Sequence, residues 1–383
     1  MSSVEDWTVE IRDANRTRVG MLGIQDMTGL TFTVDAVDTG SWSISLPASS
    51  QAAPLLTAPG AGIIVTMPDG TRFSGPVTSC EWASGPGEDL GDHWTITGAS
   101  DGILMSRTPL LPDPSKPIGE QTQEKATWTG DRAMLLCRAL SCLGTLTPDL
   151  TLPAEGSVKD GDSATLTVDW QTVLEGVQSL AMRKYAVAVT QDATGTGLTA
   201  GVTRARDMTH TAVYDTDMGG LQSFHTRSKT PAHTRAIYKW THDDTTSWLP
   251  TAVDPLTALE ATYGMRISVM DIQGDYASLD EAKTAAAGMA KADASSVLSD
   301  MTAASGTITD GTLLDGVHAG DIVSVSDGTG GIMSAQITSI TTGFTDGVVQ
   351  SATLGDWTAV DSRLAYADRL RMYDRRISRL ERK

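Results

Sequence analysis

The residues best suited to chemistry in this sequence are histidines near its middle. Four of them fall within 33 residues and two aspartates follow the last one directly: His210, His225, His233, His242, Asp243 and Asp244. Imidazole and carboxylate groups are the usual zinc ligands, but a helical zinc site needs two histidines four residues apart, and no His-Glu-x-x-His motif is present. We therefore interpret these histidines as exposed loop residues and expect neither a metal nor a cofactor.

Paired carboxylates are a second candidate, because glycoside hydrolysis uses one acid and one base or nucleophile. Asp162 with Asp169, or Asp215 with Asp217, could supply such a pair. Neither pair is flanked by aromatic residues that would form a sugar groove, and nucleophile-elbow, phosphate-loop and dinucleotide motifs are absent. A cell-wall hydrolase is therefore the weakest of our alternatives, and we predict no catalytic residue and no enzyme.

Aromatic residues give a third candidate. Trp240 and Trp248 flank His242, and together they could contact a glycan. This alternative makes the protein a carbohydrate-binding adhesin. The remaining candidates, Cys137 and Cys142, lie in an amphipathic helical pattern that favours buried thiols over a catalytic one.

Charge is unevenly distributed along the chain. The net charge is −18, whereas residues 363–383 hold eight basic and three acidic side chains, a net of 8 − 3 = +5, which leaves −18 − 5 = −23 for the rest. An acidic surface does not grip phosphate backbones, so we expect no specific nucleic-acid binding, although DNA could slide past. The sequence has no N-terminal signal pattern and no apolar run of about 18 residues, so we expect no membrane span.

The elements that must position these residues include a β-module that occurs twice. Residues 59–101 and 319–357 each contain a glycine turn, a β-run, an Asp-Gly hairpin, a second β-run and a closing strand. A chain that builds the same β-unit at both ends is typical of a ring or tube component.

The rest of the pattern divides the chain into five segments. We expect a first β-barrel domain (1–108), a linker with a helical and β insertion (109–185), an α+β module (186–270), a helix followed by a second β-barrel (271–358) and a charged C-terminal helix (359–383). The four prolines of 109–117 indicate an extended linker. The fold class is thus mainly β, with two similar small barrels, an inserted α/β module and a terminal helix.

The C-terminal segment carries a short heptad pattern. Apolar residues alternate at spacings of four and three: Tyr366, Leu370, Tyr373, Ile377 and Leu380. This spacing predicts a self-association seam or a helix docked on a partner.

The β-phrases at both ends resemble a known family. Trp7-Thr-Val-Glu-Ile-Arg, Ser41-Trp-Ser-Ile-Ser-Leu, Phe73-Ser-Gly-Pro-Val and Gly320-Asp-Ile-Val-Ser-Val are similar to phrases of minor tail proteins, or tail hubs, of long-tailed phages that infect actinobacteria. The resemblance implies relatives among baseplate hubs and type VI secretion spikes. It also implies that each subunit contributes two barrels, so that a homotrimer matches a six-fold tail tube.

The function that the resemblance implies is structural. We expect a tail-tip hub of the virion, assembled in the host cytoplasm, that caps the tail tube, anchors receptor-binding parts and gates DNA exit. The implied partners are two further copies of the chain, the distal tail protein and tail tube, the tape-measure protein, other baseplate or receptor-binding proteins, and DNA in passage.

Overall fold

The computed structural model describes residues 7–359, apart from residues 24–25, 86–90, 146, 148, 159–160, 182–183, 194, 216–220, 229, 243–244, 273–275, 277, 310–315, 327–331 and 345–347. One compact unit contains the chain up to Ser223 together with Thr307–Leu354, and a second contains Phe224–Gly306 and Gly355–Thr358. None of the helices in the described ranges combines the length and apolar character needed to cross a membrane. The predicted heptad seam at 366–380 lies outside the described residues.

The N-terminal part of the first unit is a β-region that confirms the mainly β prediction. Its elements are β1 (Thr8–Arg12), β2 (Arg18–Leu22), β3 (Gly29–Asp35), β4 (Ser41–Pro47), α1 (Ala53–Leu56), β5 (Gly62–Thr66), β6 (Arg72–Ala83), β7 (His93–Ala99) and α2 (Ile103–Arg107). Alternating side chains of these strands form one apolar core that includes Phe32, Trp42 and Ile96. Period-two alternation of this kind is what places one face of a strand inside.

The duplicated module is present in both halves of the first unit. Its C-terminal copy is built from β19 (Ile322–Ser326), β20 (Ile332–Phe344) and β21 (Val348–Ala359). β5 pairs with β6 from Gly62↔Pro76 to Thr66↔Arg72, and β19 pairs with β20 from Ile322↔Gln336 to Ser326↔Ile332. The two hairpins therefore have the same length and register.

Glycine opens both modules for the same steric reason. Gly60 has φ 78° and Gly320 has φ 99°, a region that residues with a Cβ avoid. A Cβ would also lie 2.6 Å from the Cβ of Ala14 in the first module and 2.7 Å from the Cβ of Ala186 in the second. A turn of the same kind therefore starts each copy.

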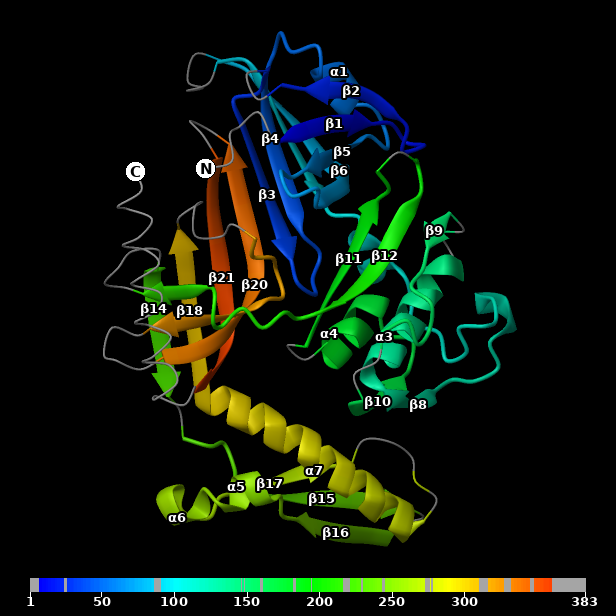
Figure 1. Ribbon diagram of the computed structural model, residues 1–383. Helices are drawn as coiled ribbons and strands as arrows, with labels where there is room; N and C mark the ends of the chain where they lie inside the picture. Colours follow the sequence, from blue (N-terminus) through cyan, green and yellow to red (C-terminus); the bar gives the residue numbers. More distant parts are fainter. Residues whose placement is uncertain are drawn as a thin grey trace. The chain divides into compact units, whose positions relative to one another are not determined.

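The second module joins the first β-region through a strand pair within the chain. β20 pairs antiparallel with β3 from Ser339↔Asp35 to Phe344↔Leu30, directly beyond its pairing with β19 (Figure 1). The resulting strand order in the first unit is β21-β20-β3-β4-β7-β6-β5-β1-β2. Among the described strands no sheet closes into a barrel, so the predicted barrels are observed here as open, joined modules.

β6 is the counterpart of β20 in the first module, and the edge of β6 that corresponds to the β3-paired edge of β20 is unpaired. β5 covers β6 only as far as Pro76, and beyond it the described strands include no partner on that side of Thr78–Ala83. This outer part of β6 is exposed, and Trp82 is 44% exposed with its ring 5.0 Å from that of Trp94. Unpaired edges of this kind are templates for pairing with another chain.

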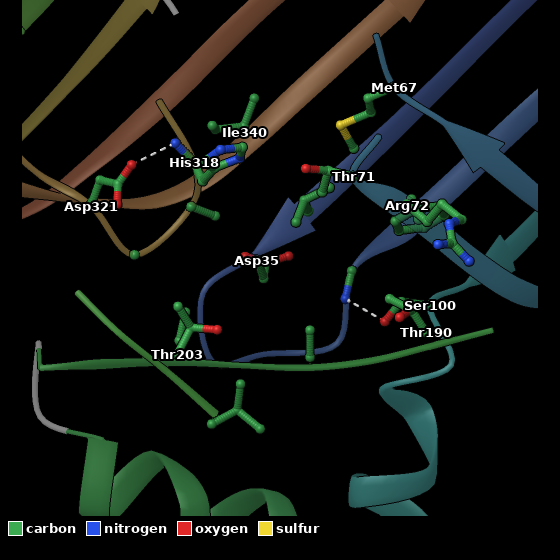
Figure 2. A pocket seen from close by; sticks show the side chains of 18 of the residues that line it. Asp35, Met67, Thr71, Arg72, Ser100, Thr190, Thr203, His318, Asp321 and Ile340 are labelled. Atoms are coloured by element: carbon green, nitrogen blue, oxygen red, sulfur yellow. Dashed lines mark hydrogen bonds between the residues drawn. The ribbon is translucent and has the colours of Figure 1, made fainter. Parts of the chain in front are cut away.

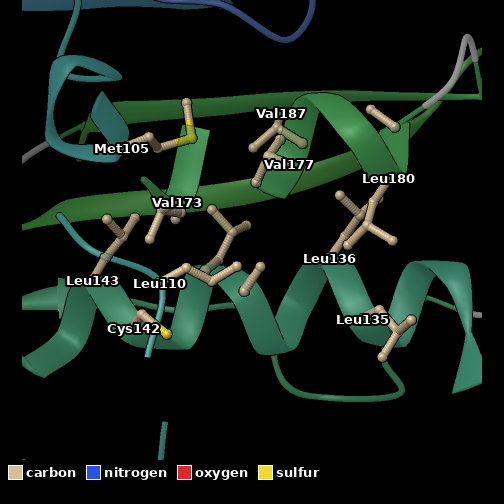
Figure 3. Packing of buried hydrophobic residues seen from close by; sticks show 14 of the residues in the cluster. Met105, Leu110, Leu135, Leu136, Cys142, Leu143, Val173, Val177, Leu180 and Val187 are labelled. Carbon is tan, nitrogen blue, oxygen red and sulfur yellow. The ribbon is translucent and has the colours of Figure 1, made fainter. Parts of the chain in front are cut away.

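A mixed α/β region follows the first β-region. It contains a 3-10 turn (Ile118–Glu120), β8 (Ala126–Asp131), α3 (Arg132–Ser141), a second 3-10 turn (Cys142–Thr145), β9 (Leu150–Thr151), β10 (Ser163–Val168), α4 (Val173–Ala181), β11 (Tyr185–Gln191) and β12 (Leu198–Arg204). Figure 3 shows Leu136 of α3 facing Val177 and Leu180 of α4 within a core that also includes Val187 of β11. This core is separate from that of the first β-region.

The predicted linker at 109–117 is a correction to the sequence interpretation. Leu110 and Leu111 are fully buried in the α/β core, and the Leu110 N–H donates to the Gln171 carbonyl at 2.7 Å. Residues 112–116 form bends and a turn, in which the Lys116 N–H donates to the Asp113 carbonyl at 3.1 Å, so the segment is not extended throughout, and its apolar pair anchors it.

The second unit consists of a small sheet and a helix. Its elements are β15 (Arg235–His242), β16 (Thr245–Thr251), α5 (Asp254–Thr257), α6 (Glu260–Tyr263), β17 (Ile267–Asp271) and α7 (Leu279–Met301). Ala282, Ala286 and Ala290 of α7 pack on one face of the sheet β16-β15-β17 (Figure 1). Ser278 and Glu281 fit the sequence pattern of a capping box, and the serine half of it is present, because the Glu281 N–H donates to Ser278 Oγ at 3.3 Å. β13 (Val213–Asp215) belongs to the first unit, and β14 (Leu221–Ser228) and β18 (Thr302–Thr309) contain the crossings between units.

Candidate functional site

A cavity of about 360 Å³ lies in the first unit, where the first β-region, the β11–β12 hairpin and the second module meet. Its walls come from the end of β3, the β5–β6 turn, β11, the end of β12, the loop before β19, and β20. Figure 2 shows Asp35 among the lining side chains, with Thr71 on one side and Thr203 on another. The lining combines apolar strand residues with a small number of charged groups, which is the composition of a ligand site.

Asp35 is a cavity-lining carboxylate with a raised pKa. It ends β3, and its side chain is half-buried against the cavity. Burial, and then the nearby charge of Asp38, raises the pKa of Asp35 to about 6. No cation lies within salt-bridge distance of its carboxylate among the described residues.

Arg206 and Asp321 fix the loop that forms one wall of the cavity. Arg206 Nε donates to Asp321 Oδ1 at 2.9 Å, its Nη2 contacts the other carboxylate oxygen, and Nη2 also donates to the Gly316 carbonyl at 2.9 Å. The His318 N–H donates to Asp321 Oδ2 at 2.7 Å. These bonds tie the end of β12 to the loop that precedes β19.

His318, directly before the second module, contacts the Asp-Gly turn within the first module. Its Nε2 lies 3.6 Å from Oδ2 of Asp69, which belongs to the Asp-Gly turn of the first module. Both side chains are more than a third exposed, so we expect this pair to stabilise the junction only weakly.

A buried polar network lies beside the cavity. Arg12 of β1 makes a bidentate ion pair with Asp101 at 2.6 and 2.8 Å, and its Nη1 also donates to Gln191 Oε1 at 2.9 Å. Ser74, which lines the cavity, donates to Asp101 at 2.6 Å and accepts from the Gln191 N–H at 2.7 Å. The network therefore joins the first β-region to the end of β11.

Two further arginines hold the turn after β11. Arg18 donates to the carbonyls of Asp192, Ala193 and Gly195 at 2.8 to 3.0 Å, and Arg72 donates to the Gln191 carbonyl at 3.2 Å. Charged donors to several carbonyls are strong and directional, so the turn has one defined position on the first β-region.

A pH prediction follows from Asp35. Because its folded pKa lies above the ordinary value near 4, the folded state binds more protons than the unfolded state between about pH 4 and 6. Stability therefore falls as the pH rises through that window. Since the group is only half-buried, solvent screening reduces the penalty above pH 6 to about 1 kcal/mol.

We expect Asp35→Asn to remove this penalty. The free energy of unfolding of the variant, measured by urea denaturation, should exceed that of the wild type by about 1 kcal/mol at about pH 8 and by much less at about pH 4. Asp169→Asn, at an exposed position, should show no such pH-dependent difference. An equal difference in the free energy of unfolding between Asp35→Asn and the wild type at both pH values would contradict the raised pKa of Asp35.

The tryptophans of the predicted glycan site lie on opposite faces of β15–β16. Trp240 is buried against α7 and stacks on His242 at 5.6 Å between ring centroids, whereas Trp248 is 56% exposed. The structure therefore does not bring Trp240 and Trp248 to one surface, and only Trp248 offers an exposed ring.

The histidines and aspartates considered as metal ligands or acid–base groups have other roles where the structure describes them. His233 is buried and its Nε2 contacts Asp293 at 2.5 Å. Hydrogen bonds from Lys184 and then Arg132 lower the pKa of Asp162, which makes it an ion-pair partner instead of an acid. Asp217, Asp243 and Asp244 lie outside the described residues, and among the described ones no group of three or more metal-binding side chains converges.

The cysteines behave as the helical pattern predicts. Cys137 and Cys142 are buried in or next to α3, and burial raises the pKa of both thiols. A raised pKa disfavours the thiolate that a nucleophile needs.

The sequence interpretation missed the cavity. Its charged residues come from positions as far apart as 35 and 321, and each lies in an ordinary turn or strand end. No spacing along the chain marks them as neighbours.

A family model described as "Siphovirus ReqiPepy6 Gp37-like protein" matches residues 8–356. The chain belongs to this family. The match spans both copies of the module and the regions between them, so the resemblance to phage tail proteins that the β-phrases suggested is confirmed at the level of the family. The actinobacterial host stays a prediction. A comparison with curated proteins finds no significant match.

Solved structures of phage tail proteins share the fold of this Gp37-like family member. A tail protein from Neisseria meningitidis MC58 has 13% identity and a TM-score of 0.54, covering 91% of this chain and 96% of its own. The 43 kDa tail protein of prophage MuSo2 from Shewanella oneidensis has 11% identity and a TM-score of 0.52, covering 91% and 97%. The prophage tail protein gp18 from Listeria monocytogenes EGD-e has 13% identity and a TM-score of 0.50, covering 96% and 99%.

Proposed function

We propose that this protein is a structural hub of a phage tail tip that assembles as a homotrimer with six β-modules around a channel. The family and the fold support a tail component. The finer assignment rests on one observation, the strand pair within one chain between β20 of the second module and β3 of the first β-region.

The ring follows from repeating that junction. Because the modules share one register, β6 of the first module stands where β20 stands in the second. The outer edge of β6 is unpaired in the single chain, so a strand of a neighbouring copy can pair with it as β3 pairs with β20. A head-to-tail contact of this type generates a closed ring when the rotation permits, and closure removes the sheet edges.

The mechanism in this proposal is mechanical and assigns no catalytic residue. The ring would join the six-fold tail tube to distal tail and receptor-binding proteins. An acidic channel wall would let DNA pass without binding it, since binding requires cationic contacts to phosphates. Opening on host contact would release the tape-measure protein and then the genome.

Trp82→Glu tests the ring. A buried carboxylate at the proposed β6 edge should weaken association by at least about 10–100-fold in Kd, because charges in interface cores are costly when unpaired. Light scattering after size-exclusion chromatography should show a trimer for the wild type and monomers for the variant. Electron micrographs of the wild type should show a ring with a central channel.

Trp248→Glu is the matched control, because Trp248 is also exposed but lies in the second unit. It should leave the trimer intact. A wild-type monomer, or equal effects of the two substitutions, would overturn the proposal. Loss of host-glycan binding in Trp248→Glu with an unchanged mass would favour the adhesin alternative.

A further inference from the structure

We propose that the cavity beside Asp35 binds an alkylammonium group, supplied either by a lysine side chain of a partner tail protein or by a free amine. The alkyl part would lie between apolar walls and the ammonium group would pair with the carboxylate. This site lies inside one chain and does not depend on the trimeric ring.

The walls suit an alkyl chain. Apolar residues from every part of the junction line the cavity: Val34, Met67, Phe73, Ala186, Ala188 and Ile340. The volume of about 360 Å³ lies near the lower end of the range of about 300–1,000 Å³ that is typical of ligand pockets. It therefore fits a single side chain or a small amine better than a large ligand.

Four aspartates line the cavity against three arginines, and of these arginines Arg204 is exposed and makes no salt bridge with Asp35 in the described part of the chain. Arg206 is engaged by Asp321, His318 by Asp69, and Arg72 by the Gln191 carbonyl. In Figure 2 the guanidinium of Arg72 points away from Asp35. The charges of these groups are thus directed to partners other than Asp35.

The two carboxylates at the end of β3 have no such partner. The Asp35 side chain makes no hydrogen bond or ion pair in the described part of the chain, and the Asp38 carboxylate accepts from the N–H of the adjacent Thr39 at 2.7 Å. A half-buried carboxylate beside a second carboxylate is stabilised by any cation that enters, and an ammonium group supplies both charge and hydrogen-bond donors.

A buried donor in the same lining is also unsatisfied. Trp7 lines the cavity, is 8% exposed, and its Nε1 has no hydrogen-bond partner. Buried donors of this kind are uncommon in folded proteins. A lysine residue carries a carbonyl oxygen next to its alkyl chain and could accept this bond, whereas a simple amine could not.

The first experiment compares three probes of similar shape by isothermal titration calorimetry at about pH 7.5. Hexylamine should bind with a Kd on the order of 0.1–1 mM, and hexan-1-ol and hexanoate should bind at least about tenfold more weakly. Asp35→Asn should reduce hexylamine affinity at least tenfold, and the exposed control Asp169→Asn should not. Since Asp35→Asn is expected to increase stability, lost binding in that variant is not explained by unfolding, and its melting temperature checks this.

Two outcomes overturn the proposal. In the first, the titration of hexylamine releases no more heat of binding than the titration of hexan-1-ol. The other is hexylamine binding that Asp35→Asn leaves unchanged, which would show that the amine binds elsewhere.

A second experiment separates the two sources. An acetylated and amidated Leu-Lys-Leu peptide and its Leu-norleucine-Leu counterpart are titrated against the protein and then against the hexylamine complex. Tighter binding of the lysine peptide and displacement of hexylamine support a partner's lysine. Hexylamine binding without peptide binding supports a free amine and excludes the lysine source.

The pH dependence identifies the carboxylate that acts. The charged groups around Asp35 are Asp38 on the same loop, Asp69 and Arg72 from the β5–β6 hairpin, Arg204 and Arg206 from the end of β12, and His318 and Asp321 from the loop before β19. Because histidine as a residue type can change its charge near neutral pH, His318→Gln is the control. Hexylamine affinity should fall from about pH 7.5 to about pH 5 in the wild type and in His318→Gln, and should stay constant in Asp35→Asn.

Discussion

Replacing Arg12 by methionine is expected to lower the free energy of unfolding by about 3–5 kcal/mol. Arg12 is 3% and Asp101 is 4% exposed, so the substitution leaves a buried carboxylate without its bidentate partner. It also removes the donor to Gln191 and so weakens the contact between the first β-region and β11. Urea denaturation followed by circular dichroism measures the effect.

Two further variants make this test specific. Arg12→Met with Asp101→Leu should lose less than Arg12→Met alone, because replacing both buried charges by apolar groups removes the uncompensated one. Lys116→Met, which breaks the exposed pair with Asp113, should change stability by no more than about 1 kcal/mol. A loss below about 1 kcal/mol for Arg12→Met would show that water reaches Asp101 and that the network is not a closed one.

Leu136→Ala is the second large expected effect, with a loss of about 2–5 kcal/mol. Leu136 is fully buried between α3 and α4, where a truncated side chain leaves a cavity that the helices cannot fill without moving (Figure 3). Leu174→Ala on α4 is the control, because Leu174 is only partly buried and should cost distinctly less. Equal losses for the two leucines would indicate that the helices repack freely.

The separate cores add a second readout to this experiment. Trp128 reports on the α/β core and Trp42 on the core of the first β-region. In single-tryptophan backgrounds, Leu136→Ala should shift the urea midpoint seen by Trp128 at least as far as that seen by Trp42. A larger shift of the midpoint reported by Trp42 than of that reported by Trp128 would contradict the placement of Leu136 in the α/β core.

Local patterns in the sequence were sufficient for most elements. The three- and four-residue spacing of Val173, Val177 and Leu180 predicts the buried face of α4, because one face of a helix repeats in that way. The alternation in the N-terminal 105 residues predicts strands for the same kind of reason. The pattern of residues 128–150 predicts a helix that already includes Thr129, whereas residues 129–131 end β8, and Asp131 caps α3 by accepting from the N–H groups of Ala133 and Met134.

Contacts between distant segments could not be read from the sequence. Trp240 and Trp248 differ by eight residues, and only the hairpin between β15 and β16 determines that they face opposite ways. Asp35 acquires its environment from strands that lie up to about 300 residues away in the chain. The same holds for Leu110, whose burial depends on packing against α4 and not on the prolines around it.

The junction between β3 and β20 has a consequence for how the protein is made. Thr33 and Thr341, whose hydroxyl groups are 2.9 Å apart across this junction, are separated by 308 residues. At about 5–20 residues per second, a ribosome needs about 15–60 seconds to synthesise that stretch. During this time β3 has been made but its partner strand has not, so the sheet of the first β-region carries a second open edge on every nascent chain. Neighbouring ribosomes on one message would bring such edges close together, and the cell must keep them apart until the last strands emerge.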